Sequence, residues 1–112
     1  MSSQEVSVPE PHPLDRLFAT IESRRTAEAQ SSYTAELFSH GVLKIAKKVG
    51  EEGVETALAA VAQDSRALAR ESADLLYHLL VLWAVCGITP QDVYAVLAER
   101  AERPAKQRAK PD

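Results

Sequence analysis

Apolar side chains recur along this chain at the spacing of α-helices. The first run begins just after Pro13 and predicts an amphipathic helix that ends near Arg24 or Arg25, because proline is favoured at the first helical position. Its inward face is formed by Leu14, Leu17, Phe18 and Ile21. No strand pattern of alternating apolar and polar residues competes with the helical one, so an all-α fold is expected.

Two long helices are predicted in the middle of the chain. A helical pattern runs from 42 to about 62, and a second one runs from 65 to 86. Asp64 or Ser65 is placed to cap the second helix, and Gly87 is placed to end it. Because only a very short turn joins these helices, we expect them to lie antiparallel and side by side.

A polar segment, 26–41, separates the first helix from the long pair. Ser32 or Thr34 is placed to cap a short turn of helix within it, and Gly41 is placed to stop that turn. The segment as a whole is polar. We therefore expect a mobile connection.

The last helix is predicted to begin at Thr89 and Pro90, a capping residue followed by proline. Its inward-facing residues are expected to be Val93, Val96 and Leu97. Residues 1–13 carry three prolines, and 104–112 have no apolar side chain larger than alanine, so both are expected to be flexible tails. The prediction is one domain at 14–103, an antiparallel bundle of four helices that dimerisation completes.

Composition and charge narrow the class of protein. The 112 residues are 46% hydrophobic and 26% charged, which is typical of a globular domain. A net charge of −3 provides no basic surface for a phosphate backbone, so nucleic acid is not an expected partner. The apolar stretch at 75–88 is interrupted by His78 and is too short to span a bilayer, and the N-terminus does not resemble a signal peptide. With Cys86 as the single cysteine, we expect a cytoplasmic protein with no membrane partner.

Four carboxylates stand in the two long helices as pairs at spacing three: Glu52 with Glu55, and Glu71 with Asp74. At 100° per residue, Glu52 points into the apolar stripe of its helix and Glu55 borders that stripe. Glu71 and Asp74 share the packing face of the next helix with His78. Four carboxylates in a partly desolvated space repel one another unless a cation is present. The pattern predicts a site for Mg²⁺, with Mn²⁺ as the alternative, of the kind that substrate phosphates share.

Basic residues precede the first acidic pair. Lys44, Lys47 and Lys48 are each placed for ion pairs with acids of the same helix, and for each of them this interpretation is at least as strong as contact with a phosphate. Lys48 is the best candidate for a phosphate contact. His78 follows Asp74 by one turn; a packed, hydrogen-bonded core histidine is the first interpretation, and a metal ligand is the second.

The segments KKVGEEGVETALAA (47–60) and ESADLLYHLLVL (71–82) resemble the two-part acidic signature of the all-α nucleoside triphosphate pyrophosphatases, the MazG-like superfamily. The resemblance covers about residues 14–98 and is greatest to the phosphoribosyl-ATP pyrophosphatase branch of histidine biosynthesis. It implies that a nucleotide, 1-(5-phosphoribosyl)-ATP, is hydrolysed to 1-(5-phosphoribosyl)-AMP and pyrophosphate. It also implies that Mg²⁺ is required and that the protein is a dimeric helical bundle.

The resemblance carries over to individual residues by position. The implied metal ligands are Glu52, Glu55, Glu71 and Asp74. Glu51, the first acid of the signature, is implied to lie beside them and to orient or deprotonate the attacking water, while Lys47 and Lys48 neutralise phosphate. Gly53 departs from the alanine-like residues that are usual there, at a cost of about 1 kcal/mol in helix propensity.

Two other functions stay open on the sequence. The same metal site would serve a house-cleaning pyrophosphatase that acts on free nucleoside triphosphates. A non-catalytic helical dimer that binds a structural metal is the third hypothesis.

A homodimer is expected because the second long helix has an apolar face, away from its acids, that is too large to leave in water. That face consists of Leu76, Leu79, Leu80 and Trp83.

Overall fold

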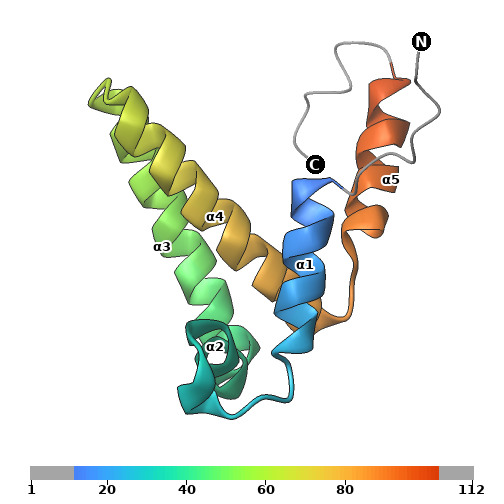
Figure 1. Ribbon diagram of the computed structural model, residues 1–112. Helices are drawn as coiled ribbons and strands as arrows, with labels where there is room; N and C mark the ends of the chain where they lie inside the picture. Colours follow the sequence, from blue (N-terminus) through green and yellow to red (C-terminus); the bar gives the residue numbers. More distant parts are fainter. Residues whose placement is uncertain (1–11, 104–112) are drawn as a thin grey trace, which may run out of the picture.

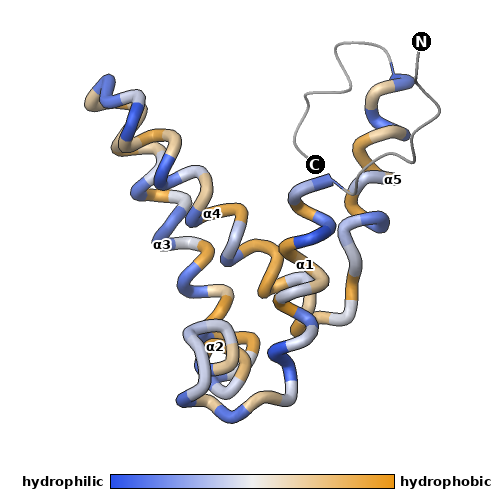
Figure 2. Tube along the Cα trace, in the orientation of Figure 1, coloured by the Kyte–Doolittle hydropathy of each residue, from blue (hydrophilic) through white to orange (hydrophobic). Residues whose placement is uncertain are grey.

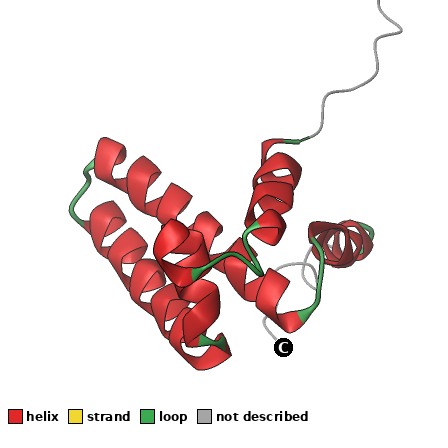
Figure 3. Cartoon of the chain, turned by 60° about the horizontal axis from the view of Figure 1, so that its bottom comes forward, coloured by secondary structure: helices red, strands yellow, loops and turns green. Residues whose placement is uncertain are grey.

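The computed structural model describes residues 12–103, and every regular element in that range is a helix (Figure 1 and Figure 3). The elements are α1 (Pro13–Ser23), the short 3-10 helix η2 (Ala29–Ser31), α2 (Tyr33–His40), α3 (Val42–Val61), α4 (Ser65–Cys86) and α5 (Pro90–Ala101). The all-α prediction is confirmed, and the short helical turn expected between Ser32 or Thr34 and Gly41 is the helix α2. The predicted tails lie outside the described residues, except that Pro13 belongs to α1 and His12 caps it.

The ends of the helices coincide with capping signals in the sequence. The Asp64 side chain accepts a hydrogen bond from the Ala67 N–H (3.0 Å), and Gly87 ends α4 in the left-handed conformation, with a φ of 82°. Thr89 and Asp92 form a reciprocal capping box at the start of α5. As predicted, a short turn makes α3 and α4 an antiparallel hairpin (Figure 1).

The segment between α1 and α3 is more ordered than its polar sequence predicts. The Ser32 hydroxyl accepts a hydrogen bond from the Ala35 N–H (3.0 Å), and Gly41 ends α2 with a φ of 86°, as expected for a short capped helix. However, Ala35 and Leu37 are buried, so the expectation of a mobile connection is wrong for residues 33–40. Two helical turns are too few for apolar periodicity to reveal this packing.

The core lies where α1 and α2 pack against the start of α3 and the end of α4 (Figure 1). Its buried members are Phe18, Ile21, Leu37, Ile45, Leu80, Val81 and Ala84. Leu80 is thus internal, and Leu79 and Trp83 are half-buried, because α1 packs on α4 within the same chain. The prediction that these residues form a free apolar face is wrong, except at Leu76, which is 41% exposed.

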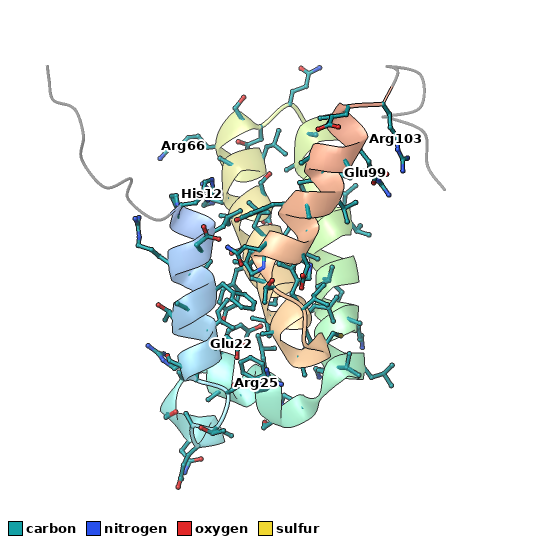
Figure 4. All side chains as sticks on the ribbon, turned by 90° about the vertical axis from the view of Figure 1, so that its right-hand side faces the viewer. His12, Glu22, Arg25, Arg66, Glu99 and Arg103 are labelled. Atoms are coloured by element: carbon teal, nitrogen blue, oxygen red, sulfur yellow. The ribbon has the colours of Figure 1, made fainter. Side chains whose placement is uncertain are left out.

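The last helix, α5, packs mainly against α1. The Tyr94 hydroxyl donates a hydrogen bond to Asp15 Oδ1 (3.1 Å), and the His12 ring meets the Tyr94 ring edge-on with 6.4 Å between centroids. Figure 4 shows His12 at the end of α1 that lies beside α5. The prediction that Val96 and Leu97 point inward is wrong, because α5 packs mainly against α1 and leaves them 46% and 58% exposed within residues 12–103.

The outer side of α3 is apolar and exposed. The α3–α4 hairpin projects away from α1 and α5, and apolar residues continue along it (Figure 2). We define the α3 apolar face as Leu43, Val54, Leu58 and Val61, whose exposed fractions lie between 60% and 84%.

In the part of the chain that the structure describes, no single helix is long and apolar enough to cross a membrane. Only α4 and α5 taken together meet those criteria, and they are bent by 109°.

Candidate functional site

Three of the four predicted metal ligands meet between α3 and α4. Glu52 and Glu55 lie one turn apart on α3, and Glu71 comes from α4. One carboxylate oxygen from each residue lies within 4.8 Å of the other two. This limit exceeds the distance of about 4.2 Å between opposite oxygen ligands of one octahedral Mg²⁺ ion and the distance of about 3 Å between adjacent ones. The three side chains would therefore rotate toward one another to share a cation.

Two of these carboxylates are partly withdrawn from water. Glu52 and Glu71 are half-buried, and the Oε1 atom of each is inaccessible to solvent and has no hydrogen-bond partner among the described residues. Glu55 is exposed at the edge of the cluster. A buried carboxylate oxygen without a partner is unfavourable, and two of them close together repel each other. The arrangement fits a divalent cation, which would supply the missing positive charge.

Thr56 links the two helices at this cluster. Its hydroxyl oxygen lies 2.7 Å from the carbonyl oxygen of Glu52, one turn earlier on α3, and 3.2 Å from the carbonyl oxygen of Glu71 on α4. The hydroxyl proton is therefore directed toward two acceptors on different helices, which fixes the register of α3 against α4 where the acids meet. The sequence places Thr56 on the inner side of α3 but does not reveal the contact with α4.

Asp74 and His78 form a separate group on α4. Asp74 is exposed and lies outside the three-acid cluster, so its role as a ligand stays a prediction. His78 is only 5% exposed, and both of its ring nitrogens have partners: the Asp74 carbonyl oxygen (2.8 Å) and the Tyr33 hydroxyl (3.0 Å). A ring with both nitrogens engaged has none left for a metal, which favours the packed, hydrogen-bonded interpretation of His78.

Lys48 and Glu51 form an ion pair beside the cluster. The distance from Lys48 Nζ to Glu51 Oε1 is 3.6 Å, and both side chains are partly exposed, so the pair alone stabilises the fold little. The pKa of Lys48 is raised, chiefly by its electrostatic interaction with Tyr33, with smaller contributions from Glu51 and Glu52 and an opposing effect of burial. The ammonium group therefore keeps its charge at neutral pH, on the side of α3 that carries the acids.

Lys47 lies on a different side of α3. Together with His40, Leu43 and Lys44 it lines an open hollow of about 710 Å³ where α2 joins α3. A rotation of about 140° around the helix separates Lys47 from Glu52. The structure does not bring Lys47 to the acids within one chain, and its contact with phosphate stays a prediction.

A polar network that sequence reasoning missed joins α2 to α4. The Tyr33 hydroxyl contacts His78 Nε2 (3.0 Å), and the Thr34 hydroxyl contacts the Tyr77 hydroxyl. The rings of Tyr33 and Tyr77 stack, with 6.1 Å between centroids. Burial raises the pKa of Tyr33, an effect that the positive charge of Lys48 opposes. The polar composition of this segment suggested a connection and gave no signal for these contacts.

Comparison with known proteins identifies relatives of the chain. Residues 14–101 match the family described as phosphoribosyl-ATP pyrophosphohydrolase. A phosphoribosyl-ATP pyrophosphatase of Azospirillum brasilense is 58% identical over 87 residues, which cover 78% of each chain. A protein of the same name from Paramagnetospirillum magneticum is 53% identical over 78% of this chain and 80% of its own length. The histidine biosynthesis bifunctional protein HisIE of Campylobacter jejuni is 52% identical over 78% of this chain and 42% of its own length.

Proposed function

This chain belongs to the phosphoribosyl-ATP pyrophosphohydrolase family, and we propose on that basis that it hydrolyses 1-(5-phosphoribosyl)-ATP to 1-(5-phosphoribosyl)-AMP and pyrophosphate in histidine biosynthesis. The observation that carries this function is the cluster of Glu52, Glu55 and Glu71, which lies on helices that the family match includes. Hydrolysis of a phosphoanhydride requires positive charge beside the phosphates. Without a cation, the clustered carboxylates would repel the phosphates and oppose the reaction.

Mg²⁺ is the proposed metal. Glu52, Glu55 and Glu71 offer hard oxygen ligands, and Asp74 follows Glu71 at i+3 on α4, from where its side chain can join them. Mn²⁺ prefers the same ligand type and is the alternative. When bound, the metal would offset charge that develops on the phosphate oxygens and make the attacking water more acidic.

Glu51 and Lys48 have complementary roles in this proposal. Glu51 would accept a proton from the attacking water, since its carboxylate is exposed and it directly precedes Glu52 in α3. Lys48 would bind phosphate oxygens, and its ion pair with Glu51 keeps the ammonium group on the acidic side of α3. Attack by water forms one bond from oxygen to phosphorus and breaks the bridging one, so pyrophosphate leaves without a covalent intermediate on the protein.

We also propose that the active protein is a homodimer. The α3 apolar face exposes four large apolar side chains along one helix, which is unfavourable in water. A second copy of the chain presents the same face, and two such faces can pair about a two-fold axis. The acids of the site lie on the opposite side of the same helix, so a dimer would also fix the position of α3.

The experiment measures pyrophosphate release with Mg²⁺ from phosphoribosyl-ATP, ATP, GTP and dUTP. We expect a strong preference for phosphoribosyl-ATP. Glu52→Gln and Asp74→Asn should each lower kcat on the order of a hundredfold, because each removes stabilisation of transition-state charge. Asp64→Asn is the matched control, since asparagine also caps a helix and Asp64 lies outside the cluster. Comparable turnover of free triphosphates would indicate a house-cleaning pyrophosphatase, and no turnover would indicate a non-catalytic metal-binding dimer.

A further inference from the structure

The start of α3 carries basic side chains that the reaction proposed above does not use. Lys44 and Lys47 line the open hollow of about 710 Å³ where α2 joins α3, together with His40 at the end of α2. Leu43 and Ala46 also line it. Figure 1 shows this junction at the end of the α3–α4 hairpin where α2 packs. The hollow therefore combines positive charge with apolar surface.

The charge of the two lysines in this hollow is not balanced within the chain. Neither ammonium group has an ion pair or a hydrogen bond among residues 12–103. The polar residues one turn away from Lys44 are all basic: His40, Lys47 and Lys48. Glu51 follows Lys47 by one turn but pairs with Lys48. Like charges one turn apart on a helix repel each other, so a bound anion would be favourable here.

Lys44 also shares a side of α3 with the site of hydrolysis. At 100° per residue, Lys44, Lys48 and Glu55 fall within about 40° of one another around the helix. The rise along the axis from Lys44 to Glu55 is about 16 Å. This side of α3 is therefore basic at the hollow and acidic at the metal ligands, and an extended nucleotide with phosphate at both ends can lie along it. The proposed substrate has this form, because two riboses and the adenine between them separate its triphosphate from its second phosphate.

We propose that the hollow binds the phosphate of the second ribose, with Lys44 and Lys47 as its ligands. Leu43 and Ala46 offer apolar surface to the carbon atoms of that sugar. This inference rests on the proposed function for the identity of the substrate. ATP lacks the second phosphate, so the two lysines would select phosphoribosyl-ATP over free nucleoside triphosphates. Lys47, predicted from the resemblance to neutralise phosphate, would then do so at this end of the substrate.

The hollow is largely separate from the surface proposed for dimerisation. Leu43 belongs to both, but the other members of the α3 apolar face begin at Val54, about 16 Å further along the helix. Two copies that pair there need not fill the hollow. On the side of α2, His40 already faces an acid, since its Nε2 lies 3.7 Å from Glu36 Oε2. The phosphate contacts are therefore assigned to the two lysines.

The first test titrates ribose 5-phosphate into the protein in the presence of a chelator and follows the backbone amide signals by NMR. We expect the largest shifts at 40–47, away from the acids. Lys44→Met should weaken this binding about tenfold, because a charged contact with phosphate is lost, and Lys44→Arg should retain most of it. Arg66→Met is the matched control. It removes the same charge at the other end of the hairpin and should change the affinity less than about twofold (Figure 4).

The second test measures selectivity in turnover with Mg²⁺. In Lys44→Met, KM for phosphoribosyl-ATP should rise about tenfold while kcat changes less, because the lost contact binds substrate and transition state alike. ATP, added as a competitive inhibitor, should bind this variant and the wild type equally well, since it lacks the second phosphate. Arg66→Met should match the wild type in both measurements.

The outcomes separate this site from the proposed function. The role of the hollow would be overturned if ribose 5-phosphate shifted no signal at 40–47, or if Lys44→Met lost affinity for ATP as much as its KM rose. Inorganic phosphate that binds as tightly as ribose 5-phosphate, with an unchanged KM in Lys44→Met, would show an unspecific anion site and would overturn it too. A chain that binds ribose 5-phosphate through Lys44 but leaves phosphoribosyl-ATP intact would support the sugar phosphate site and contradict only the proposed substrate.

Discussion

Glu52 and Glu71 make the metal-free site a source of instability. Each buries one carboxylate oxygen that has no hydrogen-bond partner in the described part of the chain, and the two charges repel each other. A cation that binds only the folded arrangement should therefore stabilise it, by about 2.7 kcal/mol when Mg²⁺ is present at about a hundred times its Kd. Thermal unfolding with Mg²⁺ and with a chelator measures this difference.

Glu52→Gln should remove most of the dependence of stability on Mg²⁺. Without metal the neutral amide removes one of the repelling charges, so the variant should be at least as stable as the wild type. With Mg²⁺ it should gain little, because a ligand is missing. Glu102→Gln, an exposed position at the end of α5, is the control and should respond to Mg²⁺ like the wild type. A wild-type unfolding temperature that does not depend on Mg²⁺ would contradict this account.

Helical periodicity was sufficient to predict that Glu52 and Glu71 face each other, because a rotation of 100° per residue gives the direction of each side chain. It could not predict how far each side chain is buried. Asp74 shares that direction and is nevertheless exposed, and Thr56 was placed on the inner side without any sign that it contacts α4. The contact of Tyr33 with His78 was missed because it depends on the docking of a whole helix.

At the scale of elements, the junction between α2 and α3 depends on Gly41. This residue has a φ of 86° and a ψ of 177°, a backbone conformation that residues other than glycine adopt only with strain. Gly41→Ala should lower the free energy of unfolding by about 1 to 3 kcal/mol, even though nothing lies within 4 Å of the added methyl group. Urea unfolding measures the change.

Gly53→Ala is the matched substitution within α3. Its backbone is helical and its added methyl group also meets nothing within 4 Å, so it should raise the free energy of unfolding by about 1 kcal/mol through helix propensity. If Gly41→Ala raised the free energy of unfolding as Gly53→Ala does, the backbone of Gly41 would not control the junction.

The elements themselves were largely predictable, since the helix ends are set by local chemistry. Asp64, Gly87 and Thr89 each occupy the capping position that their side chain or backbone favours. The packing of α2 was not predictable, because Ala35 and Leu37 are only two buried positions in a short helix and form no long period.

At the scale of the whole molecule, periodicity identifies an apolar side of each helix but not the element that covers it. Leu80 was expected to face a partner and is covered by α1, whereas Val96 and Leu97 were expected inside and are exposed. The exposed apolar surface of the α3–α4 hairpin is instead the α3 apolar face. The homodimer therefore remains a proposal, with its interface moved from α4 to α3.

This interface can be tested at Val54, which is 60% exposed and lies on the opposite side of α3 from Glu52. Val54→Glu would bury a charge between two copies of the chain, so the dimer dissociation constant should rise at least about a hundredfold. Ala19→Glu adds the same charge at an exposed position of α1 and should leave dimerisation unchanged. Analytical ultracentrifugation measures both variants. A monomeric wild type, or a Val54→Glu dimer as tight as the wild type, would show that this face is not where two copies meet.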